Sequence, residues 1–151
     1  MAADTLEGSL TGYKEQIVPT TKAVLKWDKE LIFTGTMERG HEIEFDANNE
    51  WGCRPIDALL LSLAGCMGID LVMFLQKMRL EPESFRLELV GTRNETPPQY
   101  FKAIEMVAHV KGKNVTREKL DRAIALSREK YCSVYNSLRK DIVLNVRYVI
   151  E

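Results

Sequence analysis

The amino-acid sequence predicts an α+β fold. Three short segments in which apolar and polar residues alternate come first, at residues 22–27, 30–35 and 41–46. They are followed by a long apolar run, two more alternating segments, a segment with helical periodicity and an apolar closing segment. Strands that come in groups, with helices between the groups, are typical of antiparallel sheets packed against helices. We therefore expect antiparallel sheets with a buried central helix.

Length and composition favour a single domain over residues 1–151, because 45% of the residues are hydrophobic and can fill one core. The first 15 or so residues are polar and aperiodic, so we expect them to form a peripheral segment. The 21 basic and 22 acidic residues are interspersed and give a net charge of -1, which argues against nucleic acid as a partner. The N-terminus lacks the pattern of a secretion signal, and we expect a cytoplasmic protein.

The first three segments predict a strand meander with charged turns. In residues 41–46 Ile43 and Phe45 share one face with the side chain of His41. The alternate face is acidic and includes Asp46, so we expect that face to be solvated. A loop is expected at residues 48–54.

The apolar run that follows predicts a central helix. Pro55 suits its first turn, and Asp57 complements the positive end of the helix dipole. We expect the helix to run to about Arg79, with Lys77 near its end and Pro82 beyond it. A membrane span is disfavoured, because an aspartate lies deep within the run and the flanking segments alternate like the strands of soluble sheets. A helix that is apolar nearly all round needs more cover than one small sheet gives, which predicts a homodimer.

The second half predicts two paired strands, a helix and a last strand. The paired strands are expected at residues 84–91 and at about 100–111, and the last one at 142–150. Thr116 is placed to cap a helix that continues to about Lys140. The apolar stripe of this helix consists of Leu120, Ala123, Ile124, Tyr131, Val134, Tyr135 and Leu138.

Two of the three cysteines lie in helical segments. Ala64, Gly65 and Gly68 remove side-chain bulk around Cys66, which lets a ligand or another backbone approach the sulfur. Cys132 lies at the edge of the stripe of its predicted helix. Because a free cysteine is often a small buried hydrophobe, a packing role is the alternative for both.

Charge distinguishes the surroundings of Cys132. Arg128 and Lys130 precede it within one helical turn, and positive charge there would favour the thiolate, which is the nucleophilic form. We assign no role to Cys53. The two histidines, His41 and His109, lack the spacing of a metal site, so no metal or cofactor is expected.

Two segments carry a resemblance to a known family. RPIDALLLSLAGCMGID and AIALSREKYCSVYNSL resemble the two cysteine motifs of the osmotically inducible protein C and organic hydroperoxide resistance (OsmC/Ohr) family. The shared features are a proline that opens the central helix, two small residues before the first cysteine, an aspartate four residues after it, and a second cysteine after Glu-Lys-Tyr. The resemblance covers roughly residues 22–151 and is closer to the OsmC-like branch than to the hydroperoxide resistance enzymes.

The resemblance implies an intertwined homodimer with two active sites at its interface. It further implies that Cys66 is the peroxidatic thiol, which attacks an organic or hydrogen peroxide, and that Cys132 is the resolving thiol, which closes a disulfide. A separate thiol reductant would then recycle the protein.

The sequence departs from the hydroperoxide resistance enzymes at the position after the helix-opening proline. Those enzymes carry a glutamate there, which pairs with an arginine that favours the thiolate, whereas this chain has Ile56 followed by Asp57. Arg39 is the first candidate for the arginine beside Cys66, and Arg54 is the second.

Three functions are consistent with these features. The first is thiol-dependent reduction of peroxides by Cys66 and Cys132 as a defence against oxidative stress. The second, favoured by the missing glutamate, is a non-enzymatic protein that binds a small hydrophobic ligand in the interface pocket. The third is a structural dimer without chemistry. An assay of hydroperoxide consumption with a dithiol reductant distinguishes the first from the other two.

Overall fold

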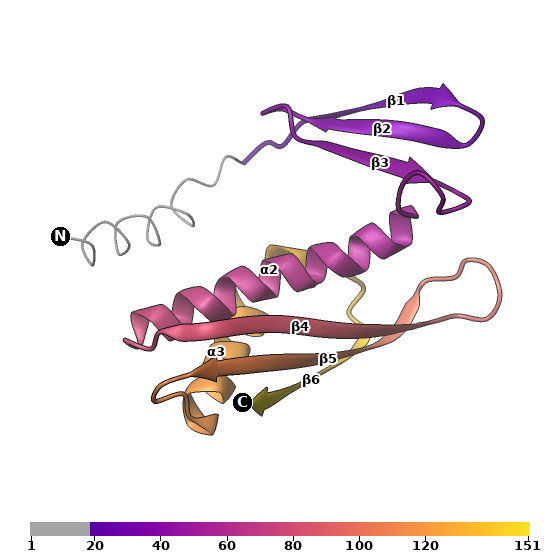
Figure 1. Ribbon diagram of the computed structural model, residues 1–151. Coiled ribbons are helices and arrows are strands. Elements are labelled where there is room, and N and C mark those ends of the chain that lie inside the picture. The colour runs from indigo at the N-terminus through magenta and orange to yellow at the C-terminus, as the bar shows by residue number, and fades with distance from the viewer. Residues whose placement is uncertain (1–18) are drawn as a thin grey trace. The chain divides into compact units, whose positions relative to one another are not determined.

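The structure, a computed structural model, describes residues 19–151 and confirms the α+β class (Figure 1). Strands and helices come in the predicted order, except that the second predicted helix is divided into two helices by a π-helical turn, η1. The elements are β1 (Ala23–Lys29), β2 (Ile32–Met37), β3 (Glu42–Asp46), α2 (Pro55–Lys77), β4 (Pro82–Arg93), β5 (Phe101–Gly112), α3 (Arg117–Leu126), η1 (Ser127–Tyr131), α4 (Ser133–Ser137) and β6 (Val143–Ile150).

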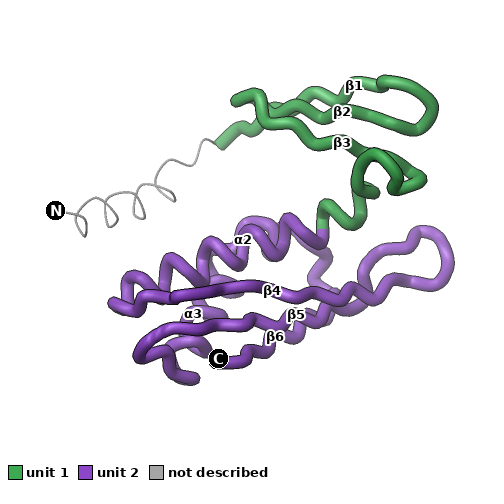
Figure 2. Tube along the Cα trace, in the orientation of Figure 1, with its two compact units in different colours: residues 1–59 green, residues 60–151 purple. Residues whose placement is uncertain are grey.

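The chain divides into two compact units, residues 1–59 and 60–151 (Figure 2). The single domain expected from the sequence stays a prediction, and the expected peripheral segment at residues 1–15 lies outside the described residues.

The first unit contains the predicted meander. β1 pairs with β2 and β2 with β3, both antiparallel, so the sheet order follows the chain order. Gly52 lies so close to the backbone of β3 that an added Cβ would be 2.5 Å from the carbonyl oxygen of Glu44. This approach lets Cys53 donate its N–H to the same oxygen and form a short parallel bridge with Phe45.

The acidic face of β3 is solvated as predicted at Glu42 and Glu44. Asp46 is the exception, because it is only 2% exposed. Its carboxylate accepts backbone N–H groups from Asn48 at 2.8 Å, from Trp51 at 3.0 Å and from Glu50 at 3.1 Å. The hydrogen bonds from Trp51 and Asn48 lower the pKa of Asp46, and the one from Glu50 adds to them against the opposing effect of burial. The alternating pattern did not predict this burial, because β3 ends at Asp46 and the following loop folds over the carboxylate.

The second unit is a three-stranded sheet in the order β4-β5-β6. The predicted pairing of β4 with β5 is antiparallel and confirmed, whereas β6 pairs with β5 in parallel. The parallel pair follows from the connection, since α3 returns the chain so that β6 starts at the same end of the sheet as β5.

The core of this unit lies on one face of the sheet. Alternate residues of β5 are buried, among them Ala108 and Val110, and they pack with Leu75 of α2 and Leu120 of α3. In β4 the predicted alternation holds: Phe85 and Leu87 are half-buried, and both pack against this cluster. Both helices therefore cover the same face of the sheet.

Helix α2 begins at Pro55 as predicted and ends at Lys77, two residues before the predicted end. Arg79 has a φ of 60°, the left-handed conformation that follows many helix ends. By length and composition α2 could cross a membrane, but 44% of an apolar 18-residue stretch of this helix is buried inside the protein. Core helices of soluble proteins have the same composition, so the apolar run is weak evidence for a membrane span.

Candidate functional site

Three side chains that can exchange protons or donate electron pairs meet in the second unit. The sulfurs of Cys66 and Cys132 and a carboxylate oxygen of Asp70 all lie within 4.8 Å of one another. Cys132 and Asp70 are fully buried, while Cys66 is partly exposed. Cys66 and Asp70 are four residues apart on α2 and therefore project from the same face of the helix. The structure thus brings together the two cysteines named from the sequence.

The same face of α2 meets the η1 turn at two further points. The hydroxyl of Ser127 donates a 2.8 Å hydrogen bond to Oδ2 of Asp70, and both residues are fully buried. One helical turn farther along, the ring of Phe74 meets that of Tyr131 edge to face, with their centroids 5.2 Å apart. Buried polar groups are costly without hydrogen bonds, so the contact between Ser127 and Asp70 fixes the carboxylate beside the sulfurs.

The predicted continuous helix from Thr116 to Lys140 is wrong, although Thr116 caps its start by accepting the N–H of Lys119. Helix α3 passes into η1, in which the N–H of Cys132 donates to the carbonyl of Ser127 at 2.8 Å, five residues back. Cys132 is then extended, with φ −72° and ψ 98°. A π-helical turn adds a residue to the usual helical spacing and therefore changes which residues face the core.

This break explains two errors in the predicted stripe. Cys132 is fully buried instead of lying at the edge, and Tyr131 is 38% exposed. The side chain of Asn136 stabilises the break, because its amide donates to the carbonyl of Arg128 at 3.1 Å and to that of Cys132 at 2.9 Å. The sequence contains no proline or glycine at this point, so periodicity alone continues the helix through it.

The environment of the Cys132 sulfur also differs from the prediction. Burial raises the pKa of Cys132 to about 12. The N–H of Tyr135, which donates to the sulfur at 3.3 Å, opposes this rise. Hydrogen bonding and charge from Cys66, together with the charge of Asp70, raise the pKa further. The expectation that nearby cations favour its thiolate is therefore wrong. Arg128 instead places its guanidinium over the ring of Tyr135, 5.5 Å from the centroid. Cys132 is a protonated thiol at neutral pH.

The two glycines near Cys66 have different surroundings. An added Cβ on Gly68 would lie 3.4 Å from Leu87 on β4, an ordinary van der Waals distance, so the packing of the helix on the sheet does not depend on a glycine here. A Cβ on Gly65 would meet no described atom within 4 Å. Leu61 and Ile69, one turn before and after Gly65, are 72% and 47% exposed. An apolar surface therefore adjoins Cys66 on α2.

The candidate arginines lie in the first unit. Arg39 is exposed in the turn between β2 and β3, and its role beside Cys66 stays a prediction. Arg54 donates from Nε to Oδ2 of Asp57 at 2.9 Å, in a pair that holds the first turn of α2. Ile56 stands at the position of the family glutamate, and the acid of this ion pair is the next residue, Asp57.

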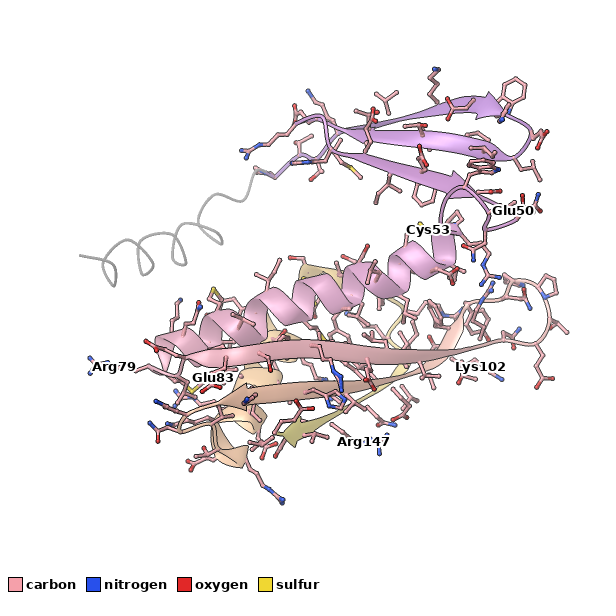
Figure 3. All side chains as sticks on the ribbon, viewed as in Figure 1. Glu50, Cys53, Arg79, Glu83, Lys102 and Arg147 are labelled. Carbon is pink, nitrogen blue, oxygen red and sulfur yellow. The ribbon has the colours of Figure 1, made fainter. Side chains whose placement is uncertain are left out.

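The other residues considered from the sequence lie elsewhere. Cys53 is in the loop just before α2 (Figure 3), where its thiol donates to the carbonyl of Glu44 at 3.7 Å. His109 lies on β5 between Glu88, at 3.4 Å, and Glu151, at 3.2 Å. These contacts account for both side chains without a role at the cysteines.

Comparison with known proteins decides the family. A model of the family described as OsmC-like protein matches residues 47–147. This chain belongs to the OsmC-like protein family. The match contains the whole of α2, both strands β4 and β5, and Cys132, so it covers every residue of the cysteine cluster.

Relatives of this OsmC-like protein agree in sequence and fold. Protein YhfA of Escherichia coli is 33% identical over 130 residues, which are 85% of this chain and 97% of YhfA. The crystal structure of a hypothetical protein from Aquifex aeolicus superimposes with a TM-score of 0.80 at 30% identity, covering 89% of this chain and 98% of that one.

The fold also extends to the hydroperoxide resistance branch. The organic hydroperoxide resistance protein OhrB of Bacillus subtilis superimposes with a TM-score of 0.58 at 17% identity, covering 86% of this chain and 98% of OhrB. At this level of identity the likeness shows a shared fold.

Two residues of the cluster were not assigned a role from the sequence, Asp70 and Ser127. The signal for Asp70 was present, because an acid four residues after a cysteine in an apolar helix must share the face of that cysteine. Ser127 offered no comparable signal, since its inward direction depends on the π-helical turn.

Proposed function

We propose that this protein reduces organic hydroperoxides, with Cys66 as the peroxidatic thiol and Cys132 as the resolving thiol. The observation that carries the proposal is the proximity of the two sulfurs, which lie within 4.8 Å although the residues are far apart in the sequence. A disulfide needs a sulfur separation of about 2.05 Å, which a modest movement of the extended Cys132 segment supplies.

The different exposure of the two cysteines supports the order of the steps. Cys66 is partly exposed beside the apolar surface of Leu61 and Ile69, where an alkyl hydroperoxide can approach. Cys132 is buried and its raised pKa makes it a poor nucleophile at neutral pH. The sulfur that meets peroxide first is therefore that of Cys66.

In the first step the sulfur of Cys66 attacks the distal oxygen of the hydroperoxide. The oxygen–oxygen bond breaks, a sulfur–oxygen bond forms, and the alkoxide leaves as an alcohol after taking a proton. The carboxylate of Asp70, one helical turn from Cys66, accepts the thiol proton and passes it to the leaving alkoxide. Cys66 becomes a sulfenic acid and the peroxide is reduced by two electrons.

In the second step Cys132 attacks the sulfur of the Cys66 sulfenic acid. The disulfide forms, the sulfur–oxygen bond breaks, and hydroxide leaves as water with the proton of Cys132. Because the pKa of this thiol is raised to about 12, it needs a base during the attack, and Asp70 is close enough to serve again. A dithiol reductant then restores both thiols by exchange.

The test compares serine variants in an assay of cumene or tert-butyl hydroperoxide with dithiothreitol. Cys66→Ser should abolish turnover, whereas Cys132→Ser should trap a sulfenic acid on Cys66 that overoxidises with excess peroxide. Cys53→Ser is the matched control and should keep wild-type turnover. Mass spectrometry of the wild type after one equivalent of peroxide should show a Cys66–Cys132 disulfide; two reduced thiols would rule the proposal out.

A second candidate, binding of a small hydrophobic ligand, rests on the exposed apolar surface of Leu61 and Ile69 beside Cys66. In that case peroxide leaves both thiols reduced, and the ligand protects Cys66 from alkylation. Arg39→Met distinguishes the two candidate functions further. If Arg39 supports Cys66, its replacement should lower the rate of peroxide consumption but should not change the affinity for a neutral ligand. Location in the cytoplasm and a homodimeric state complete the proposal.

A further inference from the structure

The cysteine cluster has the composition of a site for a thiolate-binding metal ion. Cys66 and Cys132 each offer a sulfur and Asp70 offers an oxygen, and these three atoms lie within 4.8 Å of one another. In a tetrahedral zinc site, with bonds of about 2.3 Å to sulfur and about 2.0–2.2 Å to oxygen, neighbouring donor atoms are roughly 3.5–3.8 Å apart. The three donors therefore reach zinc geometry by closing about 1 Å, which is within the range of side-chain torsions.

Two of the three donors already have hydrogen bonds of the kind that orient metal ligands. Ser127 donates to Oδ2 of Asp70 at 2.8 Å, and the backbone N–H of Tyr135 donates to the sulfur of Cys132 at 3.3 Å. Such partners outside the ligand shell fix the direction of the donor atom and strengthen metal binding. The two donor residues are fully buried, so they are held in place by packing as well.

We propose that the reduced protein binds one zinc ion through the sulfurs of Cys66 and Cys132 and the carboxylate of Asp70. Two sulfurs favour a borderline-soft ion and disfavour magnesium and calcium, which prefer oxygen ligands. Three protein ligands leave a fourth position for water. The thiols lose their protons when they bind the ion, and the divalent cation balances the negative charges that they then carry.

Zinc and the disulfide exclude each other, because both use the same two sulfurs. The proposal that the ion binds depends on the cysteine cluster alone. Only the competition between zinc and the disulfide rests on the proposed function. An organic hydroperoxide that oxidises the zinc-bound pair takes two electrons from the sulfurs and two protons from the solvent, which received two protons from the thiols when zinc bound. It leaves an alcohol and a water molecule while the disulfide forms and zinc is released. The bound ion thus keeps the thiols reduced until peroxide arrives.

The experiment measures metal binding to the full-length, chelator-treated and reduced protein without peroxide. Cobalt(II) serves as a spectroscopic probe, because ligation by sulfur gives an intense charge-transfer absorption in the near ultraviolet, and zinc should displace it. We expect one ion per chain. Cys66→Ser, Cys132→Ser and Asp70→Asn should each weaken binding of zinc at least tenfold against a competing chelator, and Ser127→Ala by about tenfold.

Cys53→Ser is the matched control and should bind zinc as the wild type does. If a variant fails to fold, a second measurement replaces it. The thiols of the wild type are alkylated, and the alkylated protein should lose the cobalt band. Absence of the band in the reduced wild type, or zinc affinity unchanged in Cys132→Ser, would overturn the proposal. If the wild type binds metal but does not consume hydroperoxide, the metal site is supported and the proposed function alone is refuted.

Discussion

Replacing Ser127 by alanine tests how α2 is joined to the turn that carries Cys132. The substitution removes the 2.8 Å hydrogen bond to Asp70, in a place where both side chains are fully buried. Removing one partner of a buried polar group costs about 1–3 kcal/mol, so we expect the free energy of unfolding to fall by about 2 kcal/mol. For a chain of this length the melting temperature should fall by roughly 4–8 °C.

Ser137→Ala is the matched control for this prediction. The hydroxyl of Ser137 donates to the carbonyl of Ser133 at 2.7 Å, but both groups are exposed. Water replaces such a bond, and the free energy of unfolding should change by less than about 0.5 kcal/mol. Urea titration at one protein concentration measures both variants, since association would otherwise change the apparent stability.

The result that would refute this reasoning is a loss in Ser127→Ala no larger than that in Ser137→Ala. The hydrogen bond to Asp70 would then contribute nothing to holding α2 against the η1 turn. The burial of Cys132 would have to rest on apolar packing alone, including the contact between Phe74 and Tyr131.

Three further predictions follow from the structure. Because the folded pKa of Cys132 is raised to about 12, its contribution to stability is full below the ordinary thiol pKa and is lost as pH rises toward 12. Unfolding by urea between pH 8 and 11 should show this decline, and Cys132→Ala should remove part of it; equal slopes would contradict the raised pKa. The pKa of Asp46 is lowered, so its contribution is present above the ordinary carboxyl pKa and is lost as pH falls through the folded value. Asp46→Asn should be less stable than the wild type at pH 6, with the difference shrinking toward pH 3, and a difference independent of pH would argue against the capping role. The exposed Leu61 and Ile69 on α2 fit the predicted homodimer, so sedimentation at micromolar concentration should give twice the chain mass, and a stable folded monomer would exclude it.

Local patterns in the sequence determined much of the fold. The alternation in β4 and β5 predicted their pairing, and Pro55 and Thr116 marked the starts of their helices correctly. These features depend on interactions between residues close in sequence, which composition and spacing record directly. The same is true of the four-residue spacing between Cys66 and Asp70, which places them on one face of α2.

Only the tertiary structure decided what that face meets. The π-helical turn rotates Cys132 and Ser127 toward α2, and neither its position nor its effect is encoded in helical periodicity. The raised pKa of Cys132 likewise follows from its burial and not from the cations near it in sequence. Burial and hydrogen bonding between distant segments depend on how the whole chain packs, because desolvation is a property of every atom around a group and not of its neighbours along the chain.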